Sequence, residues 1–416
     1  QNPVVAIPWE FESLFAHHID MYKYKAFKNY SIIFILSLIF GLYLFEMFLN
    51  FKSVDRESNI EKNKEIFKKE KNLEYDTRSK YEIYKSMKLE DKNITVTVSP
   101  RVFNDPDKKL HFLSGISKSK TIDCNENGYF SIYESDRYGF NNPDSEWKSS
   151  EIDYILVGDS YTHGACVNRP NDIASILRNL SNKKVVNLGY KANGPLSMYA
   201  SLKEYKSGKT RNIIWMYYEG NDLQDLNYEL KIRHLKKYIL NKNYFQNLKE
   251  KQDYIDAQNH KILLKSIKAW DKAREQTIKN SNIKYKILKF IRLDKSKNFI
   301  KSIIQSKNNS VPLNEFEIIL RYTKELADSE KAKLYFVYLP QFERYKTKIK
   351  NNNFIKVREI VESLNINFID IDKEVFQKEK EPLRLFPFKD WGHYNEEGYL
   401  KISELLFRKI EKKKIK

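Results

Sequence analysis

Cysteine is almost absent from this chain of 416 residues, because only Cys124 and Cys166 occur. Two cysteines are too few for a disulfide-stapled scaffold or for a cysteine-rich zinc site. They leave two alternatives. One is a single bridge, which would tie the segment before the turn at Ser160 to the C-terminal side of that turn, and the other is two free buried thiols. The chain also lacks internal repeats and, apart from its lysine-rich tail, low-complexity segments.

A concentrated basic motif is also missing, although the formal net charge is +19. The lysines are scattered among Asn, Ile and Tyr along the whole chain and do not gather with interleaved aromatic residues, which argues against nucleic acid as a partner. Attraction to anionic lipid or to an acidic polymer is compatible with this charge. A hydrophobic content of 41% predicts a real core, and the length allows one large domain with additions or two domains.

One apolar stretch stands out, "SIIFILSLIFGLYLFEMFLN" at residues 31–50. Its length matches a helix that crosses a bilayer, and it has no polar face of the kind that a soluble core helix shows. It is also far from residue 1 and no small-residue cleavage site follows it, so we expect a single-pass membrane anchor rather than a signal peptide. Basic residues flank both ends and only weakly favour a cytoplasmic N-terminus. These residues are Lys23, Lys25, Lys28, Lys52 and Arg56.

Changes in residue composition and pattern divide the rest of the chain into segments. Residues 1–30 form an N-terminal segment, and residues 51–92, rich in Lys and Glu, predict a charged helical spacer. Residues 93–150 contain short β-like runs that we expect to pack on the domain after them, and residues 151–416 form that domain. Within it, the basic and mostly helical interval 227–312 is too long for a loop and predicts an inserted helical subdomain. Whether the insertion is a lid, a partner surface or a surface elaboration stays open.

Apolar strands and amphipathic helices alternate in the domain at 151–416. Such alternation predicts an α/β fold, with a central parallel sheet covered by helices on both faces. The expected strands cover 153–159, 183–189, 211–222, 333–340 and 366–372, and the expected helices cover 171–180, 195–206, 314–332, 354–365 and 395–413. Ligands of such sheets bind at the carboxyl ends of the strands.

Polar clusters occur at these carboxyl ends, and their residue types suit acyl transfer. Ser160 offers a nucleophilic hydroxyl, His393 a base, and Asp390 a carboxylate that orients the base. Asn221 offers a side-chain amide as oxyanion donor, together with the backbone N–H of Ser160 and backbone N–H groups of the loop that contains Gly189 and Ala192. His163 is an alternative base, although its place on the same turn predicts that it projects away. No third ligand at suitable spacing accompanies Asp390 and His393, so no metal or other cofactor is expected.

Four segments together resemble the conserved blocks of the SGNH hydrolases, also called the GDSL esterase/lipase superfamily. They are "VGDSYTHG", "VVNLGYKANGP", "YYEGND" and "DWGH", within about residues 152–410. The resemblance implies a flavodoxin-like three-layer sandwich, with Ser160 as nucleophile, Asn221 as oxyanion donor, His393 as base and Asp390 as its partner. The family usually has a second glycine three positions after Gly189, where this chain has Ala192, followed by Gly194. The G-x-S-x-G elbow of the α/β-hydrolases is absent.

The similarity to membrane-anchored bacterial members of this superfamily predicts a serine esterase or O-acyltransferase. The expected substrate is an ester or acylated glycan of the cell surface, and the catalytic domain would then be extracytoplasmic. A membrane acyltransferase is a candidate partner. The alternatives are a non-catalytic component of a surface-polysaccharide assembly and a lipase or thioesterase. Retention of Ser160, Asn221, Asp390 and His393 together argues against the non-catalytic alternative.

Overall fold

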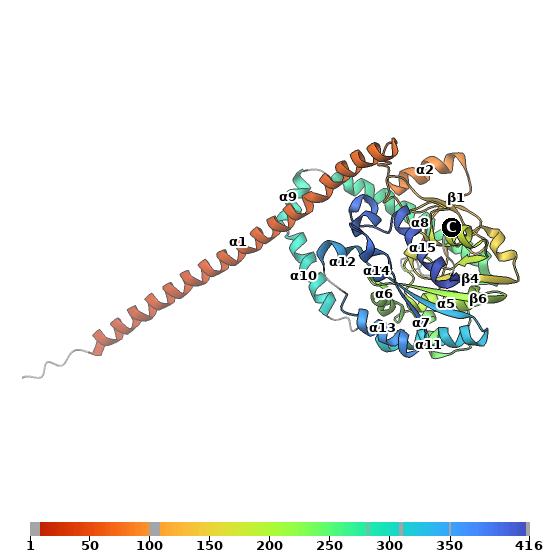
Figure 1. Ribbon diagram of the computed structural model, residues 1–416. Coiled ribbons are helices and arrows are strands. Elements are labelled where there is room, and N and C mark those ends of the chain that lie inside the picture. The colour runs from red at the N-terminus through yellow and green to blue at the C-terminus, as the bar shows by residue number, and fades with distance from the viewer. Residues whose placement is uncertain (1–8, 100–108, 281–282, 308–310, 349–350, 413–416) are drawn as a thin grey trace, which may run out of the picture. The chain divides into compact units, whose positions relative to one another are not determined.

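The protein is described by a computed structural model that covers residues 9–99, 109–280, 283–307, 311–348 and 351–412 (Figure 1). The first eight residues of the expected N-terminal segment therefore lie outside the described residues. The chain forms two compact units. The first comprises Gln1–Ile60 and Arg274–Asn308, and the second comprises Glu61–Ala273 and Asn309–Lys416.

A five-stranded parallel sheet forms the centre of the second unit. Its strands are β4 (Glu151–Val157), β5 (Val185–Asn187), β6 (Lys209–Tyr218), β7 (Lys333–Leu339) and β8 (Asn367–Asp370). Their spatial order is β5-β4-β6-β7-β8, and every neighbouring pair is parallel. In chain order this is 2-1-3-4-5, the flavodoxin-like arrangement. The predicted α/β fold is thus confirmed, and the strand order reverses between β4 and β6.

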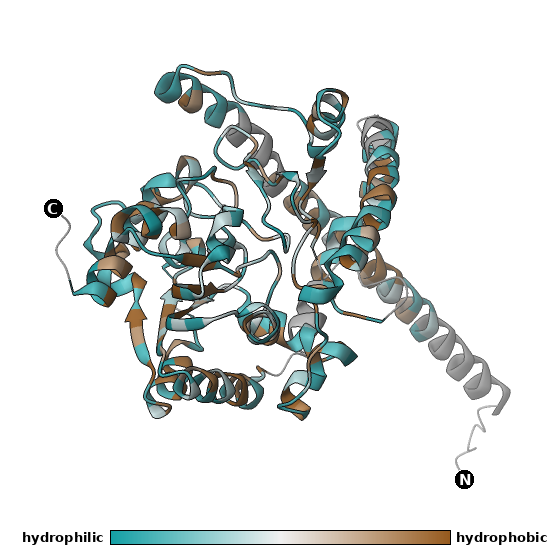
Figure 2. Ribbon diagram, turned by 90° about the vertical axis from the view of Figure 1, so that its right-hand side faces the viewer, coloured by the Kyte–Doolittle hydropathy of each residue, from teal (hydrophilic) through white to brown (hydrophobic). Residues whose placement is uncertain are grey.

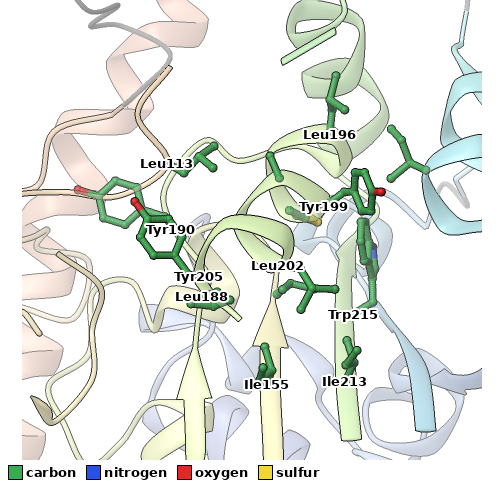
Figure 3. Packing of buried hydrophobic residues seen from close by; sticks show 14 of the residues in the cluster. Leu113, Ile155, Leu188, Tyr190, Leu196, Tyr199, Leu202, Tyr205, Ile213 and Trp215 are labelled. Carbon is green, nitrogen blue, oxygen red and sulfur yellow. The ribbon is translucent and has the colours of Figure 1, made fainter. Parts of the chain in front are cut away.

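Two hydrophobic cores fill the two faces of this sheet, because successive side chains of a strand point to opposite faces. In β4, Tyr154 and Leu156 lie in one core, whereas Ile155 and Val157 lie in the other. Helices α4 (Ile173–Ser181) and α15 (Glu396–Glu411) complete the first core. Helices α5 (Pro195–Tyr205), α11 (Leu313–Ser329) and α13 (Phe354–Ser363) complete the second, part of which is drawn in Figure 3. In Figure 2, brown marks apolar residues and teal marks hydrophilic ones, and the helices that flank the sheet carry both colours.

A second, smaller sheet precedes the main one. It contains β1 (Ile94–Val96), β2 (Lys120–Ile122) and β3 (Ile132–Glu134), with β1 parallel and β3 antiparallel to β2. Helix α2 (Lys80–Glu90) packs on it through a small core that also includes Leu263. The loop between β2 and β3, residues 123–131, is called the β2–β3 loop below.

Helix α1 (Trp9–Lys71) runs without interruption through the apolar stretch and into the expected spacer. Its part Lys23–Phe51 is long and apolar enough to cross a membrane, so it could be an anchor or a signal sequence. The interval 227–312 contains α7 (Arg233–Leu240), α8 (Gln252–Asn280), α9 (Ile283–Ile291) and α10 (Asp294–Lys307). The remaining short helices and 3-10 turns are η1 (Asp144–Lys148), α3 (Ser160–His163), α6 (Asp222–Glu229), η2 (Lys249–Lys251), α12 (Phe342–Thr347), α14 (Ile371–Glu374), η3 (Phe376–Lys378), η4 (Pro382–Leu385) and η5 (Pro387–Lys389).

Candidate active site

Ser160 begins the one-turn helix α3, directly beyond the carboxyl end of β4. Asp159 is the N-cap of this helix, and its Oδ1 accepts the backbone N–H of Tyr161 at 2.9 Å. The turn is tight, because a Cβ at Gly158 would lie 1.9 Å from Oγ1 of Thr162. Only glycine therefore fits at position 158, and the chain can turn sharply enough to present Ser160 at the edge of the sheet.

His393 lies next to this serine, on the segment between η5 and α15. Its Nε2 is 2.8 Å from Oγ of Ser160, a hydrogen-bonding distance. The imidazole packs against the ring of Tyr161, with 4.7 Å between ring centroids, and the Tyr161 hydroxyl donates to the carbonyl of Gly392 at 3.3 Å. The residue after the serine thus helps to fix the segment that carries the histidine.

Glu126, in the β2–β3 loop, is the carboxylate that the structure places against the other side of His393. Both of its oxygens lie 3.0 Å from Nδ1 of His393, and its Oε2 also accepts the His393 backbone N–H at 2.6 Å. Burial raises the pKa of Glu126, but the charge and hydrogen bonds of His393 outweigh it and leave the pKa below its ordinary value. An ionised carboxylate on Nδ1 holds the imidazole in the tautomer whose Nε2 can accept a proton.

Gly392 makes this approach sterically feasible. A Cβ at this position would lie 2.8 Å from Oε2 of Glu126. The glycine of "DWGH" therefore leaves room for a carboxylate that comes from a distant part of the chain.

The β2–β3 loop is fastened to the segment that follows Ser160. A disulfide joins Cys124 to Cys166, which resolves the alternative that the sequence left open in favour of the bridge. Asn127 donates its side-chain amide to the carbonyl of Cys166 at 3.0 Å. The buried Asp123 pairs with Lys191 at 2.5 Å. Burial alone would raise the pKa of Asp123, but the charges of Lys191 and its other basic neighbours hold it well below its usual range. These contacts fix the loop that positions Glu126.

Asp390, the partner expected for His393, accepts the backbone N–H of Trp391 at its Oδ1. Its role as the orienting acid stays a prediction, but the contact with Nδ1 of His393 is made by Glu126. Sequence reasoning did not select Glu126, because no motif surrounds it. The available signal was its position two residues after Cys124, whose bridge to Cys166 brings this loop to the serine turn.

The four expected oxyanion donors occupy different situations. Ser160 is the first residue of α3, where a backbone N–H has no acceptor within its own helix. Asn221 occupies the N-cap position of α6, at the end of β6, the neighbour of β4, but its side chain makes no capping hydrogen bond. Its buried Oδ1 has no hydrogen-bond partner among the described residues. The N–H of Gly189 already donates to Oδ1 of Asn187 at 2.8 Å, so it is used within the protein. Ala192 adopts a left-handed conformation with a φ of 62°.

His163, the alternative base, is buried away from the serine hydroxyl. Its ring packs edge-on against Tyr133 and Tyr190, and its Nδ1 lies 3.4 Å from the carbonyl of Gly189. Burial lowers its pKa. These contacts suit a neutral histidine inside the fold, and His393 is the imidazole that contacts Ser160.

Two buried carboxyl groups, Asp159 at the serine turn and Glu229 at the end of α6, have raised pKa values. Burial raises the pKa of Asp159 to about 7, although its bond from the Tyr161 N–H opposes the rise. Burial likewise raises the pKa of Glu229 to about 7. Glu229 accepts the backbone N–H groups of Gly194, Leu196 and Ser197 and so caps the N-terminus of α5. This cap anchors the end of the Gly189–Gly194 loop.

Potential metal ligands come together at one place among the described residues. Atoms of Glu126, Cys166 and His393 lie within 4.8 Å of one another. Cys166 is bonded to Cys124, however, and a disulfide sulfur is not the thiolate that binds metals. The cluster is therefore better described as the carboxylate–histidine contact with a neighbouring disulfide.

Comparisons with known proteins give a distant structural likeness. No protein-family model matches the sequence, and no curated protein matches it. The chain is similar in structure to a protein assigned to the G-D-S-L lipolytic family from Desulfitobacterium hafniense DCB-2, with 16% identity and a TM-score of 0.34 over 62% of this chain and 99% of that one. It is also similar to the acetyl xylan esterase AlAXEase, with 11% identity and a TM-score of 0.36 over 62% of this chain and 100% of that one.

Proposed function

We propose that this chain is a membrane-anchored serine hydrolase of the SGNH type, either an esterase or an O-acyltransferase. The observation that carries the proposal is the chain of contacts from Oγ of Ser160 to Nε2 of His393 at 2.8 Å and from Nδ1 of His393 to Glu126 at 3.0 Å. A hydroxyl, a base and an orienting carboxylate in this sequence of contacts are the requirements for nucleophilic acyl transfer.

In the proposed reaction, Oγ of Ser160 attacks the carbonyl carbon of an ester while Nε2 of His393 takes the hydroxyl proton. Glu126 stabilises the imidazolium that forms. The negative charge on the carbonyl oxygen is stabilised by the N–H of Ser160 and the amide of Asn221. When the carbon–oxygen bond to the alcohol breaks, His393 gives its proton to the departing oxygen, and an acyl-serine remains. Water or a sugar hydroxyl then attacks the acyl-serine by the same steps in reverse.

The proposed substrate is an acyl ester, such as an acetyl ester, of a cell-surface glycan. Two features support this class. The sequence blocks resemble those of membrane-anchored bacterial SGNH proteins, and α1 contains a stretch that can cross a membrane, so the second unit would work close to a cell surface. The choice between hydrolysis and transfer depends on whether water or a sugar hydroxyl reaches the acyl-serine.

The first experiment is labelling of the purified protein with a fluorophosphonate probe, which reacts with activated serines. We expect labelling of the wild type and none of Ser160→Ala, which should also lose turnover of a model acetyl ester while its circular dichroism and melting temperature stay unchanged. Thr162→Ala, two residues along the same helix, is a matched control for loss of a nearby hydroxyl and should still be labelled. Absence of Ser160-dependent labelling would favour the non-catalytic component of a glycan assembly.

The second experiment measures acyl release and acyl transfer from the same donor ester, with and without an added glycan acceptor. An esterase releases free acid at a rate that the acceptor leaves unchanged. An O-acyltransferase forms acylated glycan at the expense of free acid. A preference for long acyl chains without any acceptor effect would instead support a lipase or thioesterase.

A further inference from the structure

An acidic side chain, Glu46, lies within the apolar part of α1, and both of its carboxylate oxygens accept hydrogen bonds. Glu46 is 1% exposed and belongs to the stretch Lys23–Phe51. Its Oε2 accepts the backbone N–H and the hydroxyl of Ser296 at 2.8 and 2.7 Å, and its Oε1 accepts the N–H of Lys295 at 3.1 Å. These N–H groups belong to the first turn of α10. The N–H groups of a first turn have no acceptors within their own helix, and the N-terminus of a helix carries partial positive charge. Glu46 therefore attaches the N-terminus of α10 to α1.

Aromatic contacts strengthen this attachment within the first unit. The Tyr43 hydroxyl donates to the carbonyl of Ile291 at the end of α9, at 3.0 Å, and the Tyr43 ring packs on Phe290. Phe45 packs edge-on against Phe299 of α10. Helices α9 and α10, residues 283–307, are called the α9–α10 hairpin below. All of its contacts named here are made with residues 43–46 of α1.

The position of these contacts along α1 fixes the distance, along the helix axis, between the hairpin and the end of the apolar stretch. Glu46 lies five residues before Phe51, where the apolar stretch ends. At 1.5 Å per residue this is about 7.5 Å along the helix axis. If α1 crosses a bilayer, that level is the boundary between acyl chains and headgroups, which is where amphipathic helices lie.

The exposed surface of the hairpin matches such a boundary. Five large apolar side chains are between 40% and 55% exposed: Ile287, Leu288 and Ile291 of α9, and Phe299 and Ile300 of α10. Residues 283–301 also contain seven basic side chains and one acidic one, Asp294. The basic residues are Lys284, Lys286, Lys289, Arg292, Lys295, Lys297 and Lys301. Exposed apolar side chains interspersed with cations fit a surface of acyl chains and phosphate groups.

We propose that the α9–α10 hairpin binds the surface of the membrane that α1 crosses, with its apolar side chains among the upper acyl chains and its lysines on the phosphates of anionic phospholipid. Continuity with the membrane-spanning stretch and charge complementarity favour lipid over a second protein as the occupant of this surface. The inference depends on α1 as an anchor and is independent of the chemistry at Ser160.

The test uses the full chain in lipid vesicles and an environment-sensitive nitrobenzoxadiazole label on a single new cysteine. Cys124 and Cys166 are bonded to each other, so the added thiol is the one that reacts. Ile300→Cys reports the apolar surface of the hairpin. Asn298→Cys, an exposed position about 160° away around α10, is the matched control. Leu38→Cys, in the middle of the apolar stretch, reports whether α1 lies in the membrane at all.

The label at Ile300 should lose more than about half of its fluorescence to a lipid whose nitroxide lies near the top of the acyl chain, and little to aqueous iodide. The label at Asn298 should show the reverse. Addition of phosphatidylglycerol to phosphatidylcholine vesicles should increase the lipid quenching at Ile300, and high salt should reduce this increase.

Three outcomes overturn the proposal. Equal iodide quenching at Ile300 and Asn298, with lipid quenching at Leu38, places the hairpin in water while α1 remains anchored. Protection of Ile300 from both quenchers shows that protein, such as a second copy of the chain, covers it. Absence of lipid quenching at Leu38 removes the anchor itself, and fluorophosphonate labelling of the same sample then tests the catalytic proposal separately.

Discussion

Replacement of Glu126 by Gln tests the proposed active site most directly, because it removes one charge and almost no volume. Glu126 presents both oxygens to Nδ1 of His393 at 3.0 Å and accepts the His393 N–H. Gln can keep one acceptor, but its amide must then place an N–H donor near Nδ1. That arrangement favours the tautomer with the proton on Nε2, which cannot take the proton of Ser160.

The expected loss follows from this change of tautomer and from the loss of a charge that stabilises the imidazolium. In serine enzymes of this general mechanism, the corresponding change costs about 10⁴-fold in kcat, so we expect Glu126→Gln to lose about 10³- to 10⁴-fold. This corresponds to about 4 to 5.5 kcal/mol of transition-state stabilisation. The assay is turnover of a model acetyl ester, with circular dichroism and thermal melting to show that the fold is retained.

Asp390→Asn is the matched control, because it makes the same chemical change at the residue that the sequence motif favours. Oδ1 of Asp390 accepts the Trp391 N–H, and the Asn side chain retains such an oxygen. We therefore expect a loss of less than about tenfold, the size of an indirect effect. If Asp390→Asn loses as much activity as Glu126→Gln, or more, the assignment of Glu126 as the orienting acid is refuted. If Glu126→Gln loses little activity, Glu126 has only a structural role.

Three more predictions concern the surroundings of Ser160. Asn221→Ala should lower kcat by about 10²-fold or more with little change in KM, and an unchanged kcat would mean that other groups stabilise the oxyanion. Replacement of both Cys124 and Cys166 by Ser should lower the free energy of unfolding in urea by up to about 4 kcal/mol, given the separation of 42 residues. It should also lower kcat, because the disulfide no longer holds the β2–β3 loop. Equal activity of the wild type with and without reductant would contradict this effect on kcat. Burial raises the pKa of Glu229 from its ordinary value of 4.5 to about 7, so the folded state binds this proton more tightly and stability should fall as pH rises from about 4.5 through 7. Glu229→Gln should flatten this part of the profile of unfolding free energy against pH, and an unchanged slope would assign it to other buried carboxyl groups.

The sequence alone predicts the α/β architecture because its signals are local. The strand at 153–159 is a short apolar run, and the helix that starts near Asp172 has its own cap, whose side chain accepts the N–H of Ser175 at 3.0 Å. Parallel strands bring their carboxyl ends to one edge, so the sequence predicts that Ser160 and Asn221 lie at the same edge of the sheet. The charged spacer expected at 51–92 stays a prediction; within this range α1 continues to Lys71 and α2 begins at Lys80. Charged helical sequence carries little information on where one helix ends.

Only the tertiary structure decided which carboxylate meets His393, what Glu46 binds and whether the two cysteines are bonded. Glu126 and His393 are 267 positions apart, and Glu46 and Ser296 are 250 apart. Such pairs have no helical or strand period that reveals them, because they depend on how whole elements pack after distant loops have closed. The sequence alone predicted Ser160 as the nucleophile, His393 as the base and the sheet edge that they share, since these predictions follow from short motifs and from the alternation of strands and helices. The side chains that complete the site come from loops, whose positions are set by contacts with the finished fold.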